Sequence, residues 1–564
     1  MKYDIKITGG TIIDGENRPR YRGDVGIKDG KIVALGEAPG EAEREIDASG
    51  NMVSPGFVDC HTHYDAQIIW DKMMTISPWH GVTTVLLGNC GFGVAPVRPD
   101  HRDTIVRTLE NVEGMDAAAL KAGLGENWPF ETFPEYLDAI EKNGMGINVG
   151  VLMGHTPIRL YVMGEDSTER AATPEEVARM REIVREGLRA GAMGFASSKA
   201  ATHVGAGGKP VPSRLAIYKD EILEIAKVIG EEKTGIIQST IGGDVLQDQF
   251  AEMSRVANCN VTWTALLQGI NLGGGDHKEQ LKKAAALVAD GARVFPQVSP
   301  RALNFEMNFK APFIFESMKV FKPVSAADIE GKKAIYATDE FRHAFKETLE
   351  KGMALGMAGW PKAVISFCPS EPSLDERPLF EVAQERGQHP VDTMLDLSLE
   401  NNLEMRIRMP IANHDEDEVE VLLKDPNVVV GLSDGGAHAS QLCDACFSTY
   451  MLGHWVREKG ALDLEYAVYL LTSRPADVCN ITDRGRLKEG LAADVVVFNA
   501  DTVGAGELQR VYDFPAGADR LISEAYGIEA VIVNGVVLRE RGVDQINPVN
   551  GNLPGRLLRN GAAA

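Results

Sequence analysis

Short apolar runs alternate with helical patterns through the middle of the chain. The run Phe57-Val58 follows a turn at Pro55-Gly56 and leads into polar residues. Further apolar runs occupy residues 82–87, 147–153, 193–196, 234–237, 261–267, 293–298 and 428–432. Strands that alternate with helices favour a parallel sheet, and eight of them are the number that a closed barrel needs. The pattern predicts an α/β fold, a (β/α)8 TIM-like barrel over residues 55–485.

One of the intervening helices has clear start and stop signals. Thr173 is an N-cap residue, Pro174 occupies the first helical position, and Glu176 completes a capping box. An apolar stripe with helical spacing follows, and Gly191 ends the pattern. The stripe consists of Val177, Met180, Val184 and Leu188. These signals predict a helix that begins at Pro174 and ends before Gly191.

Both ends of the chain consist of short strand-like segments joined by turns. Asp29-Gly30 lies between two such segments near the N-terminus, and Asn534-Gly535 lies between two near the C-terminus. These dipeptides are typical of β-hairpin turns. We therefore expect one small β-sandwich domain built from both termini, residues 1–54 and residues 486–564, the second part including a tail.

The interval between the last two predicted strands, residues 299 to about 420, is too long for a loop. It must hold helix, an insertion or both, and phenylalanines are crowded at its start. They are Phe305, Phe309, Phe313, Phe315 and Phe321. One interpretation is that they form the insertion's own small core. The other is a lid whose aromatic inner face covers an apolar substrate, with Phe305 and Phe309 as substrate-binding residues.

Composition and charge exclude several classes of protein. At 564 residues the chain is long enough for two or more structural units. A net charge of −23 opposes binding to nucleic acid or to an anionic membrane surface. Seven cysteines in so long a chain are no disulfide framework, and no apolar run is long enough to span a bilayer. We expect a cytoplasmic enzyme without nucleic-acid or membrane partners; homo-oligomerisation stays open.

Two histidines follow the first predicted barrel strand. In an extended segment, residues i and i+2 point to the same face, so His61 and His63 can direct two imidazoles at one point. Such a pair suits a divalent transition metal, although isolated pairs of this kind are also common as surface or core histidines. Active sites of barrels lie at the carboxyl ends of the strands, which favours the metal site here.

Other strand exits also carry chemically useful residues. Cys90 follows the second strand, where a thiolate would be a soft metal ligand and an inert buried thiol is the alternative. His155 and Arg159 follow the third strand; the histidine could bind substrate, stabilise an oxyanion or be structural. Asp434 ends the last strand, and His438 lies shortly after it. A turn is the usual role of Ser-Asp-Gly, but the preceding apolar strand favours a functional one.

Several stretches together resemble the amidohydrolase superfamily. The resemblance is to its D-aminoacylase (N-acyl-D-amino-acid deacylase) branch. The matching stretches are His61-Thr-His63, residues 80–96 with Cys90, Gly154-His155 with Arg159, the strand-end Asp434, Thr472-Ser-Arg-Pro-Ala, and residues 483–494. The resemblance implies a barrel beside a composite sandwich, Cys90 as a metal ligand in place of a carboxylated lysine, and Asp434 as the catalytic base and a metal ligand.

The chain departs from the superfamily at two strand exits. The fifth and sixth strands end at Gln238 and Gln268, where the superfamily carries histidine ligands, and the branch's basic residue after the sixth strand is missing. We therefore expect zinc, one or two ions with one favoured, bound by His61, His63 and Asp434. Cys90 or His203 would complete the set. His203 lies in a polar loop whose Ser198 and Lys199 are candidate substrate-binding residues, together with Arg159 and His438.

The resulting hypothesis is a metal-dependent amidohydrolase that cleaves a carbon–nitrogen bond of a small-molecule amide with a bulky hydrophobic part. Asp434 and His155 are its candidate catalytic residues. A cyclic-amide (hydantoinase-like) hydrolase and a catalytically degenerate binding protein are the alternatives. Cys443 and Cys446 have C-x-x-C spacing, but no second pair stands at zinc-finger distance.

Overall fold

Eight parallel strands form the central sheet of the protein. The computed structural model describes residues 2–271, 274–312, 314–316, 318–352 and 359–563. The strands follow one another in sequence order around the sheet: β6 (Phe57–Asp59), β7 (Val82–Leu87), β8 (Asn148–Gly154), β9 (Gly194–Ser198), β10 (Ile236–Thr240), β11 (Val261–Thr264), β12 (Val294–Val298) and β17 (Val429–Val430). A parallel bridge between Thr62 and Gly435 joins the extensions of the first and last strands. The predicted barrel is confirmed.

The fifth barrel strand lies further along the chain than the sequence predicted, and it ends three residues later. The apolar pattern placed it at 234–237, whereas β10 continues through Gln238, Ser239 and Thr240. All three polar residues are buried at the carboxyl end of the barrel. Apolar periodicity misses this end because strands that line a site carry polar side chains there.

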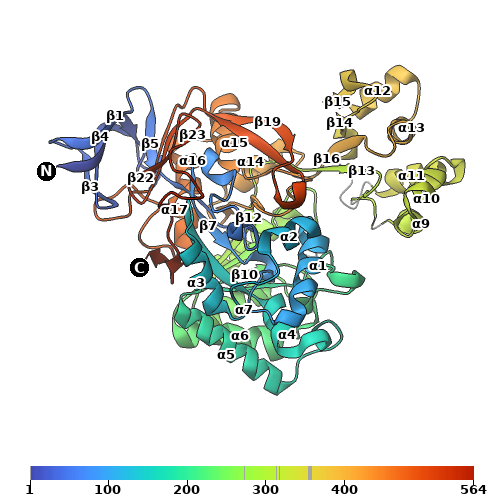
Figure 1. Cartoon of the computed structure of the whole chain (residues 1–564), viewed down its shortest axis with the longest axis horizontal. Helices are drawn as coiled ribbons and strands as arrows, with labels where there is room; N and C mark the ends of the chain where they lie inside the picture. The colour runs from blue at the N-terminus through green and yellow to red at the C-terminus, as the bar shows by residue number, and fades with distance from the viewer. Residues whose placement is uncertain (1, 272–273, 313, 317, 353–358, 564) are drawn as a thin grey trace.

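Helices surround the barrel (Figure 1). Those between the strands are α1 (Arg102–Glu113), α2 (Ala117–Leu124), α3 (Phe133–Asn143), α4 (His155–Met163), α5 (Pro174–Ala190), α6 (Leu223–Glu232), α7 (Gln247–Ala257) and α8 (His277–Ala289); after the insertion come α14 (Glu416–Lys424), α15 (Phe447–Tyr450), α16 (Leu464–Leu471) and α17 (Ser473–Val478). In α5 the predicted cap is confirmed: the Glu176 N–H donates to Thr173 Oγ1, and Gly191 closes the helix at φ 111°. The predicted stripe faces the core.

The two ends of the chain share a nine-stranded sheet. Its strands are β1 (Tyr3–Ile12), β2 (Tyr21–Lys28), β3 (Lys31–Gly36), β4 (Ala42–Asp47), β5 (Met52–Pro55), β18 (Val495–Phe498), β21 (Ile528–Val533), β22 (Val536–Glu540) and β23 (Val543–Asp544). The seam lies where β18 pairs with β5 in antiparallel register, Val497 opposite Val53. Figure 1 shows the N-terminal strands beside the C-terminal ones. The exact domain boundaries stay predictions.

A separate hairpin from the C-terminal part reaches the barrel. Strands β19 (Gly504–Val511) and β20 (Arg520–Tyr526) pair with each other. The Leu521 N–H donates to the Ala439 carbonyl (2.6 Å), and Arg510 Nη2 donates to the Ser440 carbonyl (2.9 Å). This hairpin therefore supports the loop that follows the last barrel strand. A short pair, β24 (Leu558–Arg559) and β25 (Ala562–Ala563), ends the chain.

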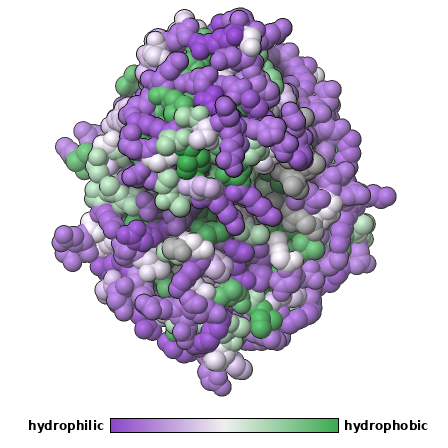
Figure 2. Space-filling model, turned by 90° about the vertical axis from the view of Figure 1, so that its right-hand side faces the viewer, coloured by the Kyte–Doolittle hydropathy of each residue, from purple (hydrophilic) through white to green (hydrophobic). Residues whose placement is uncertain are grey.

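The insertion is a compact unit with its own hydrophobic core. Its sheet contains β13 (Leu303–Asn308), β16 (Arg406–Ala412), β14 (Val364–Phe367) and β15 (Arg377–Pro378), and its helices are α9 (Lys322–Ser325), α10 (Ile329–Tyr336), α11 (Asp339–Gly352), α12 (Leu379–Arg386) and α13 (Pro390–Glu400). In Figure 1 it extends to one side of the barrel. Figure 2 views that side, where polar residues cover most of the surface and apolar areas are scattered.

The phenylalanines of the insertion correct one sequence prediction. Phe309, Phe315 and Phe321 are fully buried and contact one another or neighbouring rings of the insertion. Phe309 consequently offers no surface to a substrate, and these rings do not form a lid's inner face. Phe313 lies outside the described residues. Phe305 differs from the others, because its ring contacts His438 beside the last barrel strand (centroids 5.2 Å apart).

No helix among the described residues is long and apolar enough to span a bilayer.

Candidate metal centre

Three predicted ligands meet at the carboxyl end of the barrel. His61 Nε2 lies 3.3 Å from His63 Nε2 and 3.4 Å from Cys90 Sγ. All three side chains are buried, and their ligand atoms lie within 4.8 Å of one another. A tetrahedral zinc with Zn–N of about 2.0–2.1 Å and Zn–S of about 2.3 Å separates two nitrogens by about 3.3 Å, and a nitrogen from sulfur by about 3.6 Å. The His61–His63 and His61–Cys90 separations fit such an ion.

Asp434 borders the same centre. Its Oδ1 atom lies 3.3 Å from His61 Nε2 and 3.7 Å from His63 Nε2. Asp434 is absent from the group of mutually close ligand atoms formed by His61, His63 and Cys90. Its side chain is 23% exposed, whereas those of the two histidines are almost inaccessible. The carboxylate thus lies on the more open side of the centre.

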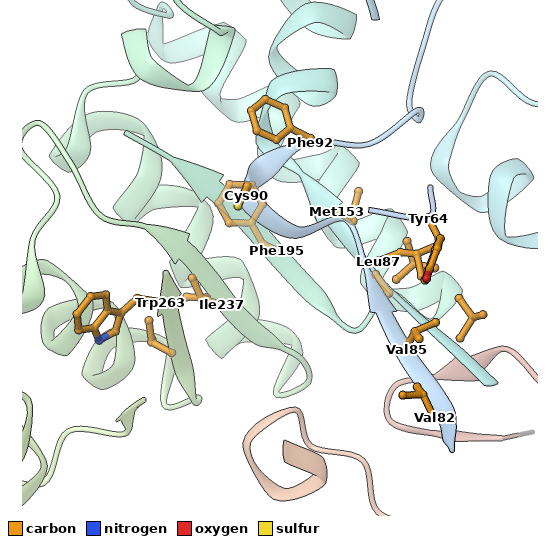
Figure 3. Packing of buried hydrophobic residues seen from close by; sticks show 14 of the residues in the cluster. Tyr64, Val82, Val85, Leu87, Cys90, Phe92, Met153, Phe195, Ile237 and Trp263 are labelled. Atoms are coloured by element: carbon orange, nitrogen blue, oxygen red, sulfur yellow. The ribbon is translucent and has the colours of Figure 1, made fainter. Parts of the chain in front are cut away.

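A strained turn places Cys90. The backbone leaves β7 at Gly88 (φ 80°), and Cys90 itself has φ 55°, a left-handed conformation that costs a non-glycine residue about 1–2 kcal/mol. A Cβ at Gly88 would lie 2.1 Å from the Leu152 carbonyl oxygen, so only glycine fits. The Cys90 N–H donates to Gln238 Oε1 (2.7 Å). Figure 3 shows the chain turning through Cys90 towards Phe92.

The two glutamines at the fifth and sixth strand exits have other contacts than metal. Gln238 accepts from the Cys90 backbone and donates through Nε2 to Thr264 Oγ1 (3.2 Å). Gln268 Oε1 accepts from the Asp415 N–H (3.1 Å), and its own N–H donates to Asn413 Oδ1 (2.8 Å). Gln238 therefore supports a ligand, and Gln268 fastens the end of the insertion to the barrel.

Each metal-site histidine has a further partner on its other ring nitrogen. His61 Nδ1 lies 2.6 Å from Gln297 Oε1, and His63 Nδ1 lies 3.7 Å from Glu113 Oε1. Neither partner was found from the sequence. Gln297 carried one signal, because it is a polar residue within an otherwise apolar strand. Glu113 lies at the end of α1, an ordinary amphipathic helix, and nothing in the sequence marked it as a partner of His63.

The charges of the centre lower the pKa values of its two acidic side chains, Cys90 and Asp434. Burial by itself would raise the pKa of the Cys90 thiol, but the adjacent His61 and His63 lower that pKa to about 7. Burial also acts to raise the pKa of Asp434, and the hydrogen bond and charge of His63, together with His61, hold it below its ordinary value. A thiolate and a carboxylate are therefore both accessible near neutral pH.

His203 lies near the centre but outside the group of close ligand atoms. Its ring contacts Phe92 (centroids 5.1 Å apart), and its Nδ1 lies 2.7 Å from Ser198 Oγ. Burial lowers the pKa of His203 to about 3, with further contributions from His63 and His438, so the ring is neutral. The cluster of close ligand atoms found among the described residues forms without it, which argues against the predicted role as a ligand.

His155 and Arg159 belong to a buried ionic network instead of the metal centre. His155 Nε2 lies 2.8 Å from Glu221 Oε1, and its Nδ1 lies 2.9 Å from Ser197 Oγ. Arg159 Nη1 donates to Glu221, and both His155 and Arg159 are fully buried. Both ring nitrogens of His155 are thus engaged, and we do not retain it as an oxyanion donor or Arg159 as a substrate-binding residue. Glu221 could not be placed from sequence.

Two other candidates, Lys199 and His438, have distinct surroundings. Lys199 Nζ donates to the carbonyls of Arg214 (2.8 Å) and Ala216 (2.7 Å), which engages it in holding its loop. His438 Nδ1 lies 3.0 Å from Gln441 Oε1, and its backbone N–H donates to the Glu113 carbonyl. Its ring also contacts Phe305, so His438 joins the loop after Asp434 to both the insertion and the end of α1.

The C-x-x-C pair is buried away from that group of ligands. Arg301 donates to Cys446 Sγ and to the Cys443 carbonyl (3.1 Å). Arg301 follows β12 at the start of the insertion, so these contacts join the insertion to the segment after the Asp434 loop.

Comparisons with known proteins agree with this geometry. Residues 44–539 match the model of the amidohydrolase family. The chain is 27% identical to a D-aminoacylase of Alcaligenes xylosoxydans xylosoxydans and 30% identical to an N-acyl-D-glutamate deacylase of the same organism, each over 100% of this chain and 98% of the relative.

Solved structures show the same fold. An N-acyl-D-glutamate deacylase from Bordetella bronchiseptica, complexed with zinc and a phosphonate inhibitor, is 26% identical with a TM-score of 0.66, over 99% of this chain and 100% of the other. A D-aminoacylase with a binuclear metal centre is 24% identical with a TM-score of 0.68, over the same shares. A D-hydantoinase is more distant, 16% identical with a TM-score of 0.51, over 99% and 98%. The chain belongs to the amidohydrolase family and is a metal-dependent hydrolase of non-peptide carbon–nitrogen bonds.

Proposed function

We propose that the protein is a deacylase of N-acyl-D-amino acids or closely related amides, active with one zinc ion. The observation that carries the proposal is the convergence of His61 Nε2, His63 Nε2 and Cys90 Sγ beside the Asp434 carboxylate. Catalytic zinc sites commonly have three protein ligands and one open position. The full-length similarity to a D-aminoacylase and an N-acyl-D-glutamate deacylase supports the substrate class.

A single ion is favoured by the contacts of the two glutamines. Gln238 and Gln268 stand where a second ion would need histidines, and both are engaged by backbone N–H groups. The donor set of two imidazoles and a thiolate suits zinc better than magnesium or calcium, which prefer oxygen ligands. We place Asp434 beside this set as the base.

The zinc ion, when bound, supplies Lewis acidity and lowers the pKa of a water molecule. Asp434 accepts a proton from the attacking water at its carboxylate, because its lowered pKa keeps it ionised at neutral pH. Asp434 then returns the proton to the leaving amine. Its partial exposure leaves it free to reach both groups.

His203 is our candidate for polarising the substrate carbonyl. The Ala200 N–H donates to Ser198 Oγ (3.2 Å), so the Ser198 hydroxyl is free to donate to His203 Nδ1. The proton of the neutral ring then resides on Nε2, where it can donate to the carbonyl oxygen. His203 takes the role that the sequence had suggested for His155.

Phe305 supports a preference for substrates with an apolar part. Its ring is the phenylalanine of the insertion that contacts His438, next to the Asp434 loop. The strand-six exit provides Gln268 instead of a cation, which weakens recognition of a free carboxylate at that place. Burial of an apolar group contributes about 25 cal/mol per Å² of area removed from water. We therefore expect bulky acyl groups or side chains to be preferred over small ones.

The test is a substrate panel with the zinc-loaded protein. It contains N-acyl-D-amino acids with large and small apolar groups, their L enantiomers, and a cyclic amide of the hydantoin class. We expect bulky N-acyl-D substrates to have the highest kcat/KM, and Asp434→Asn to abolish most of this activity. Equal or better cleavage of small N-acetyl compounds would remove the apolar preference. Ring opening without deacylation would overturn the substrate class.

The seven cysteines are all free thiols, and we propose a cytoplasmic location on that basis.

A further inference from the structure

Gln297 contacts His61 on the edge of the ring opposite the nitrogen that faces the other candidate ligands. It lies on β12, is fully buried, and places Oε1 2.6 Å from His61 Nδ1. The other ring nitrogen of His61 faces His63 and Cys90. The Nε2 atom of Gln297 is buried without a hydrogen-bond partner among the described residues. The His61 contact is therefore the interaction that this amide makes.

We propose that Gln297 is a positioning residue that selects the tautomer of His61. This inference rests on the proposed metal site. A carbonyl oxygen only accepts hydrogen bonds, so its contact requires the proton on His61 Nδ1 and leaves the Nε2 lone pair free. The opposite amide orientation would present an N–H group to Nδ1, move the proton to Nε2, and block the atom that faces the metal. Gln297 thus prepares His61 to bind.

The contrast with His63 makes the role of Gln297 specific. The Glu113 carboxylate lies 3.7 Å from His63 Nδ1, beyond hydrogen-bond distance. Gln297 lies more than an ångström closer to its histidine. Partners of this kind fix the ring orientation of metal ligands, and their loss typically weakens metal binding about 10–100-fold. We therefore expect His61 to depend on its partner more than His63 does.

A matched pair of substitutions separates the hydrogen bond from the packing. Gln297→Met keeps a side chain of similar length and removes the acceptor, and Gln297→Glu keeps an acceptor oxygen and removes the amide N–H. Gln247→Met is the control, because Gln247 on α7 is equally buried, has an unpaired Oε1, and donates to the Gln280 carbonyl outside the metal centre (3.0 Å). Zinc affinity is measured by competition with a chromophoric chelator.

We expect Gln297→Met to weaken zinc binding about 10–100-fold. Gln297→Glu and Gln247→Met should remain within a few fold of the parent. Unchanged zinc affinity in a folded Gln297→Met protein would overturn the positioning role and leave the proposed function intact. A parent protein that binds zinc no better than His61→Ala would instead overturn the metal site itself.

The tautomer can also be read directly in the metal-free parent. The chain has 12 histidines, so ¹⁵N-histidine labelling with His61→Gln as the assignment variant identifies the His61 signals. We expect the signals of the neutral form of the His61 ring to show protonation at Nδ1. This measurement decides the question if Gln297→Met fails to fold, because a ring protonated at Nε2 in the parent would overturn the proposal.

Discussion

The two halves of the barrel mouth use similar positions for different purposes. At the exits of the first and second strands, His61, His63 and Cys90 direct ligand atoms at one point. At the exits of the fifth and sixth strands, Gln238 and Gln268 accept hydrogen bonds from backbone N–H groups. One half forms the proposed metal site, and the other holds the chain that surrounds it. The difference indicates that polar residues at strand exits can support the backbone around a site instead of binding within it.

Replacement of His61 by alanine should have the largest effect. The substitution removes one of three close ligand atoms, so zinc and activity should be lost together, with kcat/KM falling by about three orders of magnitude or more. Elemental analysis and a deacylase assay on the same preparation measure both. Retained zinc with retained activity would show that the metal lies elsewhere, and the contrast between the two halves would disappear.

Asp434→Asn should separate chemistry from metal binding. The amide keeps the shape of the side chain and cannot accept the proton, so turnover should fall about 100-fold while zinc content changes little. The matched control is Asp417→Asn, the same change at an exposed carboxylate of α14. Activity of Asp434→Asn within a few fold of the parent would remove the base assignment.

Substitution of the two glutamines tests the supporting half. Gln238→Ala leaves the Cys90 N–H unpaired at a strained turn, which costs about 1–3 kcal/mol, and zinc affinity should fall by about tenfold. Gln268→Ala should leave zinc affinity unchanged, because Gln268 contacts residues 413 and 415 at the end of the insertion. Chelator competition on both variants checks the difference. Equal losses would show that both glutamines act on the metal.

Substitutions of Phe305 and Phe309 should have the smallest effects on activity. Phe305→Leu should raise KM for bulky substrates several-fold and change stability little. Phe309→Leu should lower the free energy of unfolding of the insertion by about 1–2 kcal/mol and leave KM unchanged, because Phe309 is fully buried in the insertion's core. Steady-state kinetics and thermal unfolding distinguish the two. A changed KM in the Phe309→Leu protein would instead support the interpretation of these rings as a lid over the substrate.

Local patterns predicted the barrel, and they brought out the residues that form the candidate metal centre. Apolar runs identified the strands, the capping residues around Thr173 identified α5, and the alternation of His61 and His63 pointed to two of the candidate ligands. Their partners were not predictable, because Gln297 and His61 are 236 positions apart and meet only in the closed barrel. His155 looked catalytic for the same reason: its partner Glu221 is 66 positions away. Contacts at such separations depend on the whole fold.

The pairing of β5 with β18 also determines when the sheet shared by the two ends of the chain can be completed during synthesis. Strand β5 leaves the ribosome early, and the strand that pairs with it, β18, is made only after the entire barrel and insertion. Until then one edge of the N-terminal strands is open, and open strand edges template association between chains. A nascent or truncated chain that lacks β18, Val495 and everything after it, should therefore aggregate through its N-terminal strands even when its barrel has folded.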